Sequence, residues 1–427
     1  MKNHLSELLQ IWRIYLCAMG KWLGVALVTG VLCGGIGTLF HQGVELVTEL
    51  RMAHGWLLYI LPAAGLLIGG IYKILGTAGV NTNQILEEIH SGRGVSLKLL
   101  PAIFFATLLT HLGGGSVGRE GAALQMGGTL GYQAGRMLRL DDADLRISTT
   151  VGMAAFFSAL FGTPLAATVF ALEITNVGRV YYAQFFPCLV SALSAYGISL
   201  LFGVKATCFA VLSPEGTVGM FLRVGVLAVL CALVSVLFCE GIHVAERAAK
   251  KVLPNEWQRV IAGGCAVIAL TLLLGTTDYN GAGMNVITRA VEQEKAEPAA
   301  FACKLLFTAV TLAAGYKGGE VVPSFFVGAT FGCVAGPLLG VPAGFAAAIG
   351  LVSVFCGAVN CPLASTFLAL ELFGAGGLHY FALACALSFV FSGYSGIYSS
   401  QRILYDKLKA QYINVQTNIY RADKAKK

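Results

Sequence analysis

Residues 113–128 read GGGSVGREGAALQMGG, a run of seven glycines around one arginine and one glutamate. The chain around it is strongly apolar: 56% of its 427 residues are hydrophobic and only 12% are charged, against about 25% charged in a typical soluble domain. The glycines before Arg119 predict a tight turn, and the residues after it predict a short helix with Glu120 in its first turn. An ionisable group inside an apolar chain of this kind is a candidate functional residue.

The rest of the chain predicts a multi-pass membrane protein. Several windows of at least 21 residues contain no Asp, Glu, Lys or Arg: 22–44, 52–72, 147–172 and 180–204. Crossing a bilayer takes about 20 apolar residues. The pair Lys250 and Lys251 and the tail RADKAKK (421–427) predict cytoplasmic ends. The start of the chain, which Glu7 interrupts, does not resemble a cleavable signal.

One apolar window is too long for a single helix. Residues 321–370 carry no charge, and as one helix they would span roughly 75 Å, against a hydrocarbon core of about 30 Å. Four prolines divide the window: Pro323, Pro337, Pro342 and Pro362. Broken or re-entrant helices are therefore expected, and these occur where the backbone faces protein or a watery cavity.

Other classes of function find little support in the sequence. The twelve cysteines are scattered and form no CxxC pair or His/Cys cluster, which favours free thiols over a metal site. No Ser/His/Asp set or phosphate-binding motif is present, so we expect neither an enzyme nor a cofactor. The net charge of +7 is small for this length, and we expect no nucleic-acid partner.

The sequence also contains an internal repeat. Residues 164–173, PLAATVFALE, match residues 362–371, PLASTFLALE. TLGYQAG at Thr129 matches TFGCVAG at Thr330, and Glu120 corresponds to Glu320 in YKGGEVVPSFF. Three matches in the same order at nearly constant spacing predict a duplicated membrane module. We place the boundaries at 1–20 (a cytoplasmic segment), 21–205 and 215–400 (the repeats) and 401–427 (a C-terminal helix and basic tail).

Duplicated transporters often hold their substrate near the midplane, where the two repeats meet at broken helices. The free N–H groups and partial positive charge of a helix N-terminus attract an anion. Glu120, at such an end, is favoured as a carboxylate by the helix dipole and as a neutral acid by removal from water. It would compete with the anion when charged and leave the site when protonated, which couples proton and anion movement. The alternative is that Glu120 only pairs with Arg119 or caps the helix.

These motifs resemble those of the CLC family of anion channels and anion/proton antiporters. GREGAALQMGG resembles the family's GREGP segment, residues 152–173 resemble its next two helices, and the likeness extends to SGIYSSQRILYDKL near the end. The resemblance implies an all-α polytopic membrane protein with two repeated, inverted halves, broken helices and a homodimeric assembly. It also implies that Glu120 is the gate, that Gly118, Arg119 and Gly121 line the anion site, and that Tyr398 bounds it from inside, although an ordinary interfacial tyrosine is the alternative.

Two anion-binding signatures depart from the usual pattern and resemble the fluoride/proton antiporter branch. The family's chloride-binding serine has no match in GTAGVNTNQ, where Asn81, or Gly79 on a different alignment, takes its place. The second signature reads GGEVVP, with Glu320, Val321 and Val322. That branch commonly has threonine at the position of Val322. It also lacks the proline after GREG, and this chain has Ala122 at that position. Asn81 could equally be a helix N-cap.

The usual inner proton-relay glutamate of the antiporters is replaced by Ile174, which leaves Glu320 as a possible second carboxyl. Glu173 and Glu371 recur at the ends of the repeated helices and are expected to be caps. Arg119 is expected to bond backbone carbonyls, and His111 to be a satisfied, partly buried residue. The prediction is a fluoride/proton antiporter of the bacterial inner membrane that exports fluoride. A chloride/proton antiporter or passive chloride channel of the same fold is the alternative.

Overall fold

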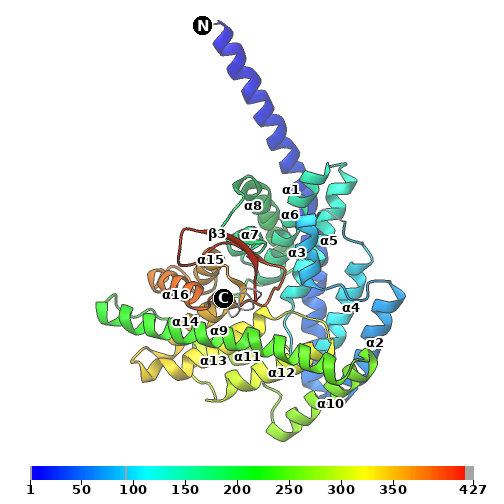
Figure 1. Cartoon of the computed structure of the whole chain (residues 1–427), viewed down its shortest axis with the longest axis vertical. Helices are drawn as coiled ribbons and strands as arrows, with labels where there is room; N and C mark the ends of the chain where they lie inside the picture. The colour runs from blue at the N-terminus through cyan, green and yellow to red at the C-terminus, as the bar shows by residue number, and fades with distance from the viewer. Residues whose placement is uncertain (1, 92–93, 419–427) are drawn as a thin grey trace.

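A computed structural model describes residues 2–91 and 94–418 and is almost entirely helical (Figure 1). The first part of the chain contains helices α1 (Lys2–Ala53), α2 (Leu61–Ile74), α3 (Thr82–Ser91), α4 (Leu99–Leu112), α5 (Glu120–Met137), α6 (Asp142–Phe161), α7 (Pro164–Glu173) and α8 (Phe185–Leu201). The second contains α9 (Val218–Val252), α10 (Glu256–Leu274), α11 (Met284–Glu292), α12 (Ala300–Ala314), α13 (Val321–Leu338), α14 (Ala343–Val359), α15 (Pro362–Phe373) and α16 (Leu378–Phe391). Short 3-10 helices cover Gly55–Ile60 and Tyr182–Gln184.

Helix lengths confirm a polytopic membrane protein with broken helices. Within the described residues, six helical segments are long and apolar enough to cross a bilayer, and six further apolar helices have only 10–17 residues. The uncharged window 321–370 divides into α13, α14 and the start of α15. Pro342 is the N-cap of α14 and Pro362 begins α15, positions where the missing N–H breaks no helical hydrogen bond. The expectation that all four prolines divide the window is wrong, because Pro323 and Pro337 lie within α13.

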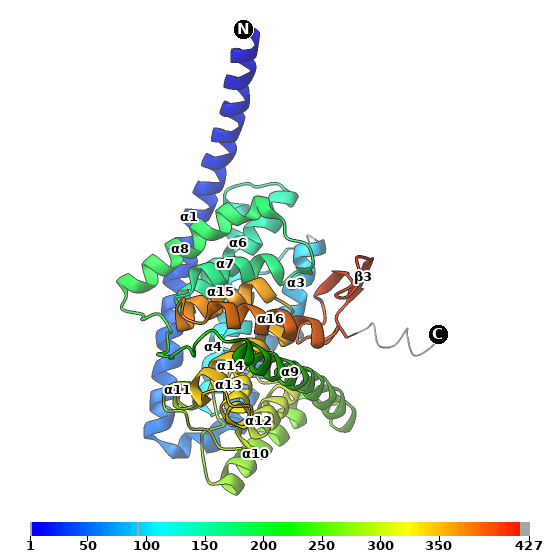
Figure 2. The ribbon, with the colours of Figure 1, turned by 90° about the vertical axis from the view of Figure 1, so that its left-hand side faces the viewer.

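The amino-terminal segment is not a separate element. The predicted boundary at residue 20 lies inside α1, which is continuous from Lys2 to Ala53. The first turns of this helix project away from the rest of the chain, as Figure 2 shows from the side. The boundaries of the two repeats, 21–205 and 215–400, remain our proposal.

Small residues let two pairs of helices approach closely. A Cβ on Gly131 of α5 would lie 2.1 Å from the Ser148 carbonyl oxygen of α6. In the second half, a Cβ on Gly332 of α13 would lie 2.1 Å from the Ala346 carbonyl oxygen of α14. Gly131 and Gly332 occupy matching places in the repeated motif. Without a hydrophobic drive between helices in lipid, such close backbone packing holds membrane helices together.

Each half caps a helix of the other. Glu371, at the end of α15, accepts hydrogen bonds from the amides of Leu165 (2.9 Å) and Ala166 (2.8 Å) at the start of α7. Glu173, at the end of α7, accepts from Leu363 (3.4 Å) and Ala364 (2.8 Å) at the start of α15. The expectation that both are caps is confirmed. A carboxylate satisfies the free amides of a helix N-terminus and matches its partial positive charge.

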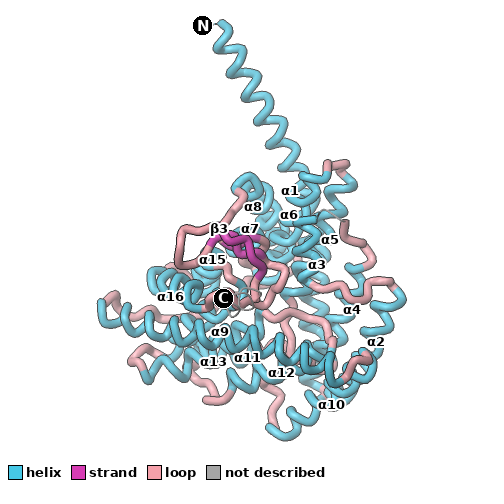
Figure 3. The backbone as a smooth tube through the Cα atoms, viewed as in Figure 1, coloured by secondary structure: helices cyan, strands magenta, loops and turns pink. Residues whose placement is uncertain are grey.

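The predicted C-terminal helix is wrong over the described part of residues 401–427. Strands β2 (Arg402–Tyr405) and β3 (Tyr412–Gln416) form an antiparallel pair, and β1 (Asn176–Val177) adds to β2 in parallel (Figure 3). The reason is tertiary, because the segment is tied to the ends of α14 and α16. The Lys407 ammonium donates to the Asn360 side-chain oxygen (2.6 Å) and the Phe389 carbonyl (2.7 Å). The basic tail 421–427 lies outside the described residues.

We predict that Glu173→Ala destabilises the protein by about 1–3 kcal/mol, because it leaves the buried Ala364 amide without an acceptor. Thermal unfolding of the detergent-solubilised protein measures the effect. Glu49→Ala is the control, since Glu49 is an exposed residue of α1. Equal midpoints for the two variants would contradict the capping role.

Candidate functional site

The N-termini of α5 and α13 meet in the interior of the molecule. The strand-like residues before the two helices pair with each other: the Gly118 amide donates to the Gly319 carbonyl at 2.7 Å, and the Gly319 amide donates to the Gly118 carbonyl at 2.8 Å. Residues 201 positions apart in the sequence are thereby locked side by side. Both helices begin directly after this pairing, so their free amide groups converge on one region.

The space at this junction leaves little room for any residue larger than glycine. A Cβ on Gly319 would lie 2.5 Å from the Gly121 nitrogen and 2.8 Å from the Glu120 nitrogen. A Cβ on Gly121 would lie 3.0 Å from the Gly318 carbonyl oxygen. These contacts are with backbone atoms, which cannot turn aside as a flexible side chain can. The repeated glycines of the sequence therefore serve the close approach of two helix ends.

Glu120 lies at this junction and is completely buried. Its Oε2 accepts a hydrogen bond from the Val322 amide, in the first turn of α13, at 3.2 Å. The same oxygen lies only 2.1 Å from the position that a Cβ on Gly118 would occupy. Its other oxygen, Oε1, is buried without a hydrogen-bond partner. The side chain thus folds back over the glycine pairing and holds the amide end of the other half's helix.

Tyr398 is the second polar group buried near this point. It is only 2% exposed, and its hydroxyl has no hydrogen-bond partner. Its position is held by the backbone, because Thr417 and Gln401 both donate to the Tyr398 carbonyl, at 2.5 and 3.1 Å. Tyr398 follows the last helix, α16, whereas the sequence predicted that it precedes one.

The side chain of Arg119 points away from the junction. One guanidinium nitrogen lies 2.7 Å from His41 Nδ1 on α1, and another donates to the Leu160 carbonyl of α6 at 3.2 Å. The guanidinium also stacks near the Phe161 ring, 5.3 Å from its centroid. Arg119 therefore anchors the start of α5 to two neighbouring helices, and one of the two contacts is to a backbone carbonyl, as the sequence predicted.

Asn81 does not reach Glu120 in the structure. It is exposed and precedes α3, where its side-chain oxygen accepts from the Gln84 amide at 3.2 Å. Gly79 is also exposed. The next residue, Thr82, turns inward instead: its hydroxyl lies 3.4 Å from the Gly121 carbonyl and accepts from Gln125 Nε2 at 3.1 Å. The structure therefore contains the helix N-cap, one of the two roles that the sequence allowed for Asn81.

Thr82 and Gln125 were missed by the sequence reasoning. Gln125 lies on α5 five residues after Glu120, and its Oε1 is buried without a partner. The available signal was a polar residue one turn into an otherwise apolar, glycine-rich helix. Nothing in the sequence distinguished Thr82 from its neighbour Asn81, because the choice depends on which of them faces α5.

Of the remaining candidate residues, one contacts the Glu120 carboxyl group. Val321 and Val322 are buried in the first turn of α13, and only the Val322 amide contacts the Glu120 carboxyl. Glu320 is the N-cap residue of α13 but makes no side-chain capping bond, and it is partly exposed. His111 is fully buried and only half satisfied, against expectation: its Nδ1 lies 2.9 Å from the Thr107 carbonyl, and its Nε2 has no hydrogen-bond partner. Among the described residues, no group of three or more His, Cys, Asp or Glu is arranged to hold a metal.

Comparisons with known proteins find relatives that cover most of the chain. The sequence model of a family described as voltage gated chloride channel matches residues 64–393. A protein of Pseudomonas syringae pv. tomato, named a chloride/fluoride channel protein, is 36% identical over 402 residues, which cover 91% of this chain and 88% of that protein. The H(+)/Cl(-) exchange transporter ClcA of Vibrio cholerae serotype O1 is 28% identical over 393 residues, 82% of this chain and 81% of that one.

A solved structure resembles the whole chain. The crystal structure of a CLC-type fluoride/proton antiporter superposes with a TM-score of 0.86 at 31% sequence identity, and the match covers 90% of this chain and 98% of that one.

We predict that Gly319→Ala destabilises the protein by about 1–3 kcal/mol, because the added methyl group must push apart two backbone segments. Thermal unfolding measures the change, and Gly35→Ala is the control, since a Cβ on Gly35 of α1 meets nothing within 4 Å. Unchanged stability of Gly319→Ala would show that the two helix ends do not need this approach.

Proposed function

The chain belongs to the voltage-gated chloride channel family, and from that premise we propose that it is a fluoride/proton antiporter that exports fluoride across the bacterial inner membrane. The family consists of ion channels and transporters, so the activity sought is ion movement across the bilayer and not a chemical reaction. The observation that carries the proposal is the position of Glu120, whose carboxyl group holds the amide end of α13 in the buried junction.

The first step of the mechanism is competition for the helix end. A charged Glu120 takes the Val322 amide, which is the donor that an anion would use. When Glu120 is protonated, its attraction to the helix N-terminus falls, because the partial positive charge there favours a negative group. An anion then binds the released amide. One proton is taken up for each departure of the carboxyl group from the site, which couples the two movements.

The second step uses the acid form of the same group. A protonated carboxyl is a hydrogen-bond donor, and fluoride is a small, strongly accepting anion. Oε1 of Glu120 has no partner in the buried junction, so the proton has a place there from which to bind fluoride. The Tyr398 hydroxyl, also buried without a partner, is a second donor that we assign to the inner boundary of the site.

The names of the relatives support fluoride as the ion, since one is called a chloride/fluoride channel protein and the matched structure is that of a fluoride/proton antiporter. Proton-coupled chloride transport, or passive chloride movement, is the second candidate, because another relative is called an H(+)/Cl(-) exchange transporter. We further propose a homodimer with a separate pathway in each subunit, and Glu320 as a second proton-binding carboxyl.

We predict that Glu120→Gln abolishes proton-coupled fluoride movement in liposomes, because glutamine cannot exchange a proton. A fluoride electrode follows transport driven by an imposed pH gradient, and a chloride electrode repeats the measurement for the alternative ion. The wild-type protein should move fluoride against its own gradient when a proton gradient is imposed.

The exposed variant Glu49→Gln is the matched control and should behave as wild type. Coupling that survives in Glu120→Gln would remove Glu120 from the gate. Coupled chloride movement with no coupled fluoride movement in the wild type would replace the fluoride proposal by the chloride one.

A paired substitution tests which polar residue at the start of α3 serves the site. We predict that Thr82→Val slows fluoride transport by about tenfold, as expected for loss of one buried hydrogen-bonding group. Asn81→Ser should have little effect, because serine also caps a helix and Asn81 is exposed. Fluoride efflux from liposomes gives both rates. The reverse order would return the contact to Asn81.

A further inference from the structure

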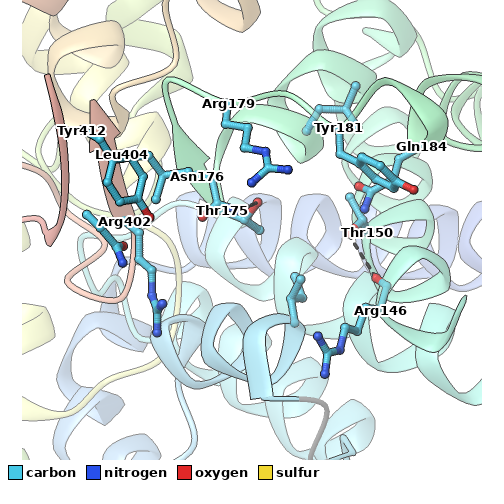
Figure 4. Close-up of a pocket in the computed structure, with 13 residues that line it drawn as sticks. Arg146, Thr150, Thr175, Asn176, Arg179, Tyr181, Gln184, Arg402, Leu404 and Tyr412 are labelled. Carbon is cyan, nitrogen blue, oxygen red and sulfur yellow. Dashed lines mark hydrogen bonds between the residues drawn. The ribbon is translucent and has the colours of Figure 1, made fainter. Parts of the chain in front are cut away.

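A cavity lies away from the junction of α5 and α13, and three arginines are among the residues that line it. Its volume is about 320 Å³, and it is lined from α6, from the loop around β1 and from strands β2 and β3. Figure 4 shows Arg146 on α6, Arg179 on the loop after β1 and Arg402 on β2, on separate walls of the cavity. None of the residues that surround Glu120 lines it.

The charge in this cavity is of one sign. No aspartate or glutamate lines it, and the polar side chains that accompany the arginines are amides and hydroxyls, such as Asn176, Asn414 and Thr175. Among the described residues, no ion pair joins any of the three arginines to a carboxylate. Three arginines that line one cavity with no carboxylate among the lining residues give it a positive potential. Such a cavity favours an anionic occupant.

We propose that this cavity binds a phosphate ester. A guanidinium group presents its N–H donors in a planar fork that fits two phosphate oxygens at once. A phosphate ester, unlike a monatomic ion, is extended enough to contact arginines on separate walls of the cavity. The size agrees, because small-molecule sites begin at about 300 Å³, whereas a single water-sized particle takes up about 30 Å³.

The position of the cavity gives binding a structural consequence. Arg402 lies on β2, which pairs with β1, and Arg179 follows β1 by two residues. Arg146 belongs to α6, which otherwise has no pairing with the sheet. A phosphate ester that contacts arginines of both the sheet side and α6 would therefore tie the three-stranded sheet to the helical body. Binding should raise the thermal stability of the whole chain.

The test measures thermal unfolding of the full chain in detergent with two phosphate sources. One arm titrates inorganic phosphate, and the other titrates short-chain phosphatidic acid in the same micelles. Sodium chloride at matched ionic strength corrects for screening. The variants are Arg179→Gln and Arg402→Gln. The control is Arg136→Gln, an exposed arginine near the end of α5 that does not line the cavity.

The expected result is a rise in the unfolding midpoint of the wild type, with an apparent affinity about tenfold weaker in Arg179→Gln and Arg402→Gln and unchanged in Arg136→Gln. A response to inorganic phosphate identifies a soluble phosphate ester as the ligand class, and a response to phosphatidic acid alone identifies a lipid headgroup. No response to either source, or an equal response in all four proteins, would overturn the proposal.

Discussion

The pairing of Gly118 with Gly319 is the constraint on which the site depends. Two backbone hydrogen bonds, at 2.7 and 2.8 Å, hold the starts of α5 and α13 together in the interior. Buried amides must find acceptors, and at the start of a helix the helix itself supplies none. The Glu120 carboxyl meets part of this need through the Val322 amide. An anion is the other kind of acceptor for a free amide at a helix N-terminus, and the competition that we propose between acid and anion rests on this.

A second exchange between the halves keeps this junction in place. Glu173 and Glu371 each cap the helix of the opposite half, so α7 and α15 hold one another by their ends. Glycines on the repeated helices let backbones touch, at Gly131 against α6 and at Gly332 against α14. Small side chains and carboxylate caps replace the hydrophobic drive that lipid cannot supply. The scaffold is tightly packed around Glu120, whose side chain is the part that moves in the mechanism that we propose.

Three of the buried polar atoms without a hydrogen-bond partner belong to residues of the proposed site. They are Glu120 Oε1, Gln125 Oε1 and the Tyr398 hydroxyl. Each such group costs about 1–3 kcal/mol in a folded protein. In the mechanism that we propose, the two oxygen acceptors would be met by hydrogen-bond donors, one of them the transported proton, and the tyrosine hydroxyl would donate to the anion. Other unpartnered atoms, such as the Thr29 and Ser353 hydroxyls, lie elsewhere in the chain, so the missing partner alone does not identify the site.

Local spacing in the sequence determined the membrane helices, their interruption by prolines, the duplication, and the position of Glu120 at the start of a helix, because each depends on residues close together in the chain. Tertiary contacts decided the rest. Thr82 faces α5 while Asn81 caps α3, because neighbouring residues at the start of a helix point in different directions. Residues 402–405 and 412–416 form strands because β1 and Lys407 tie this segment to distant parts of the fold. The arginine cavity joins three segments that no sequence pattern connects.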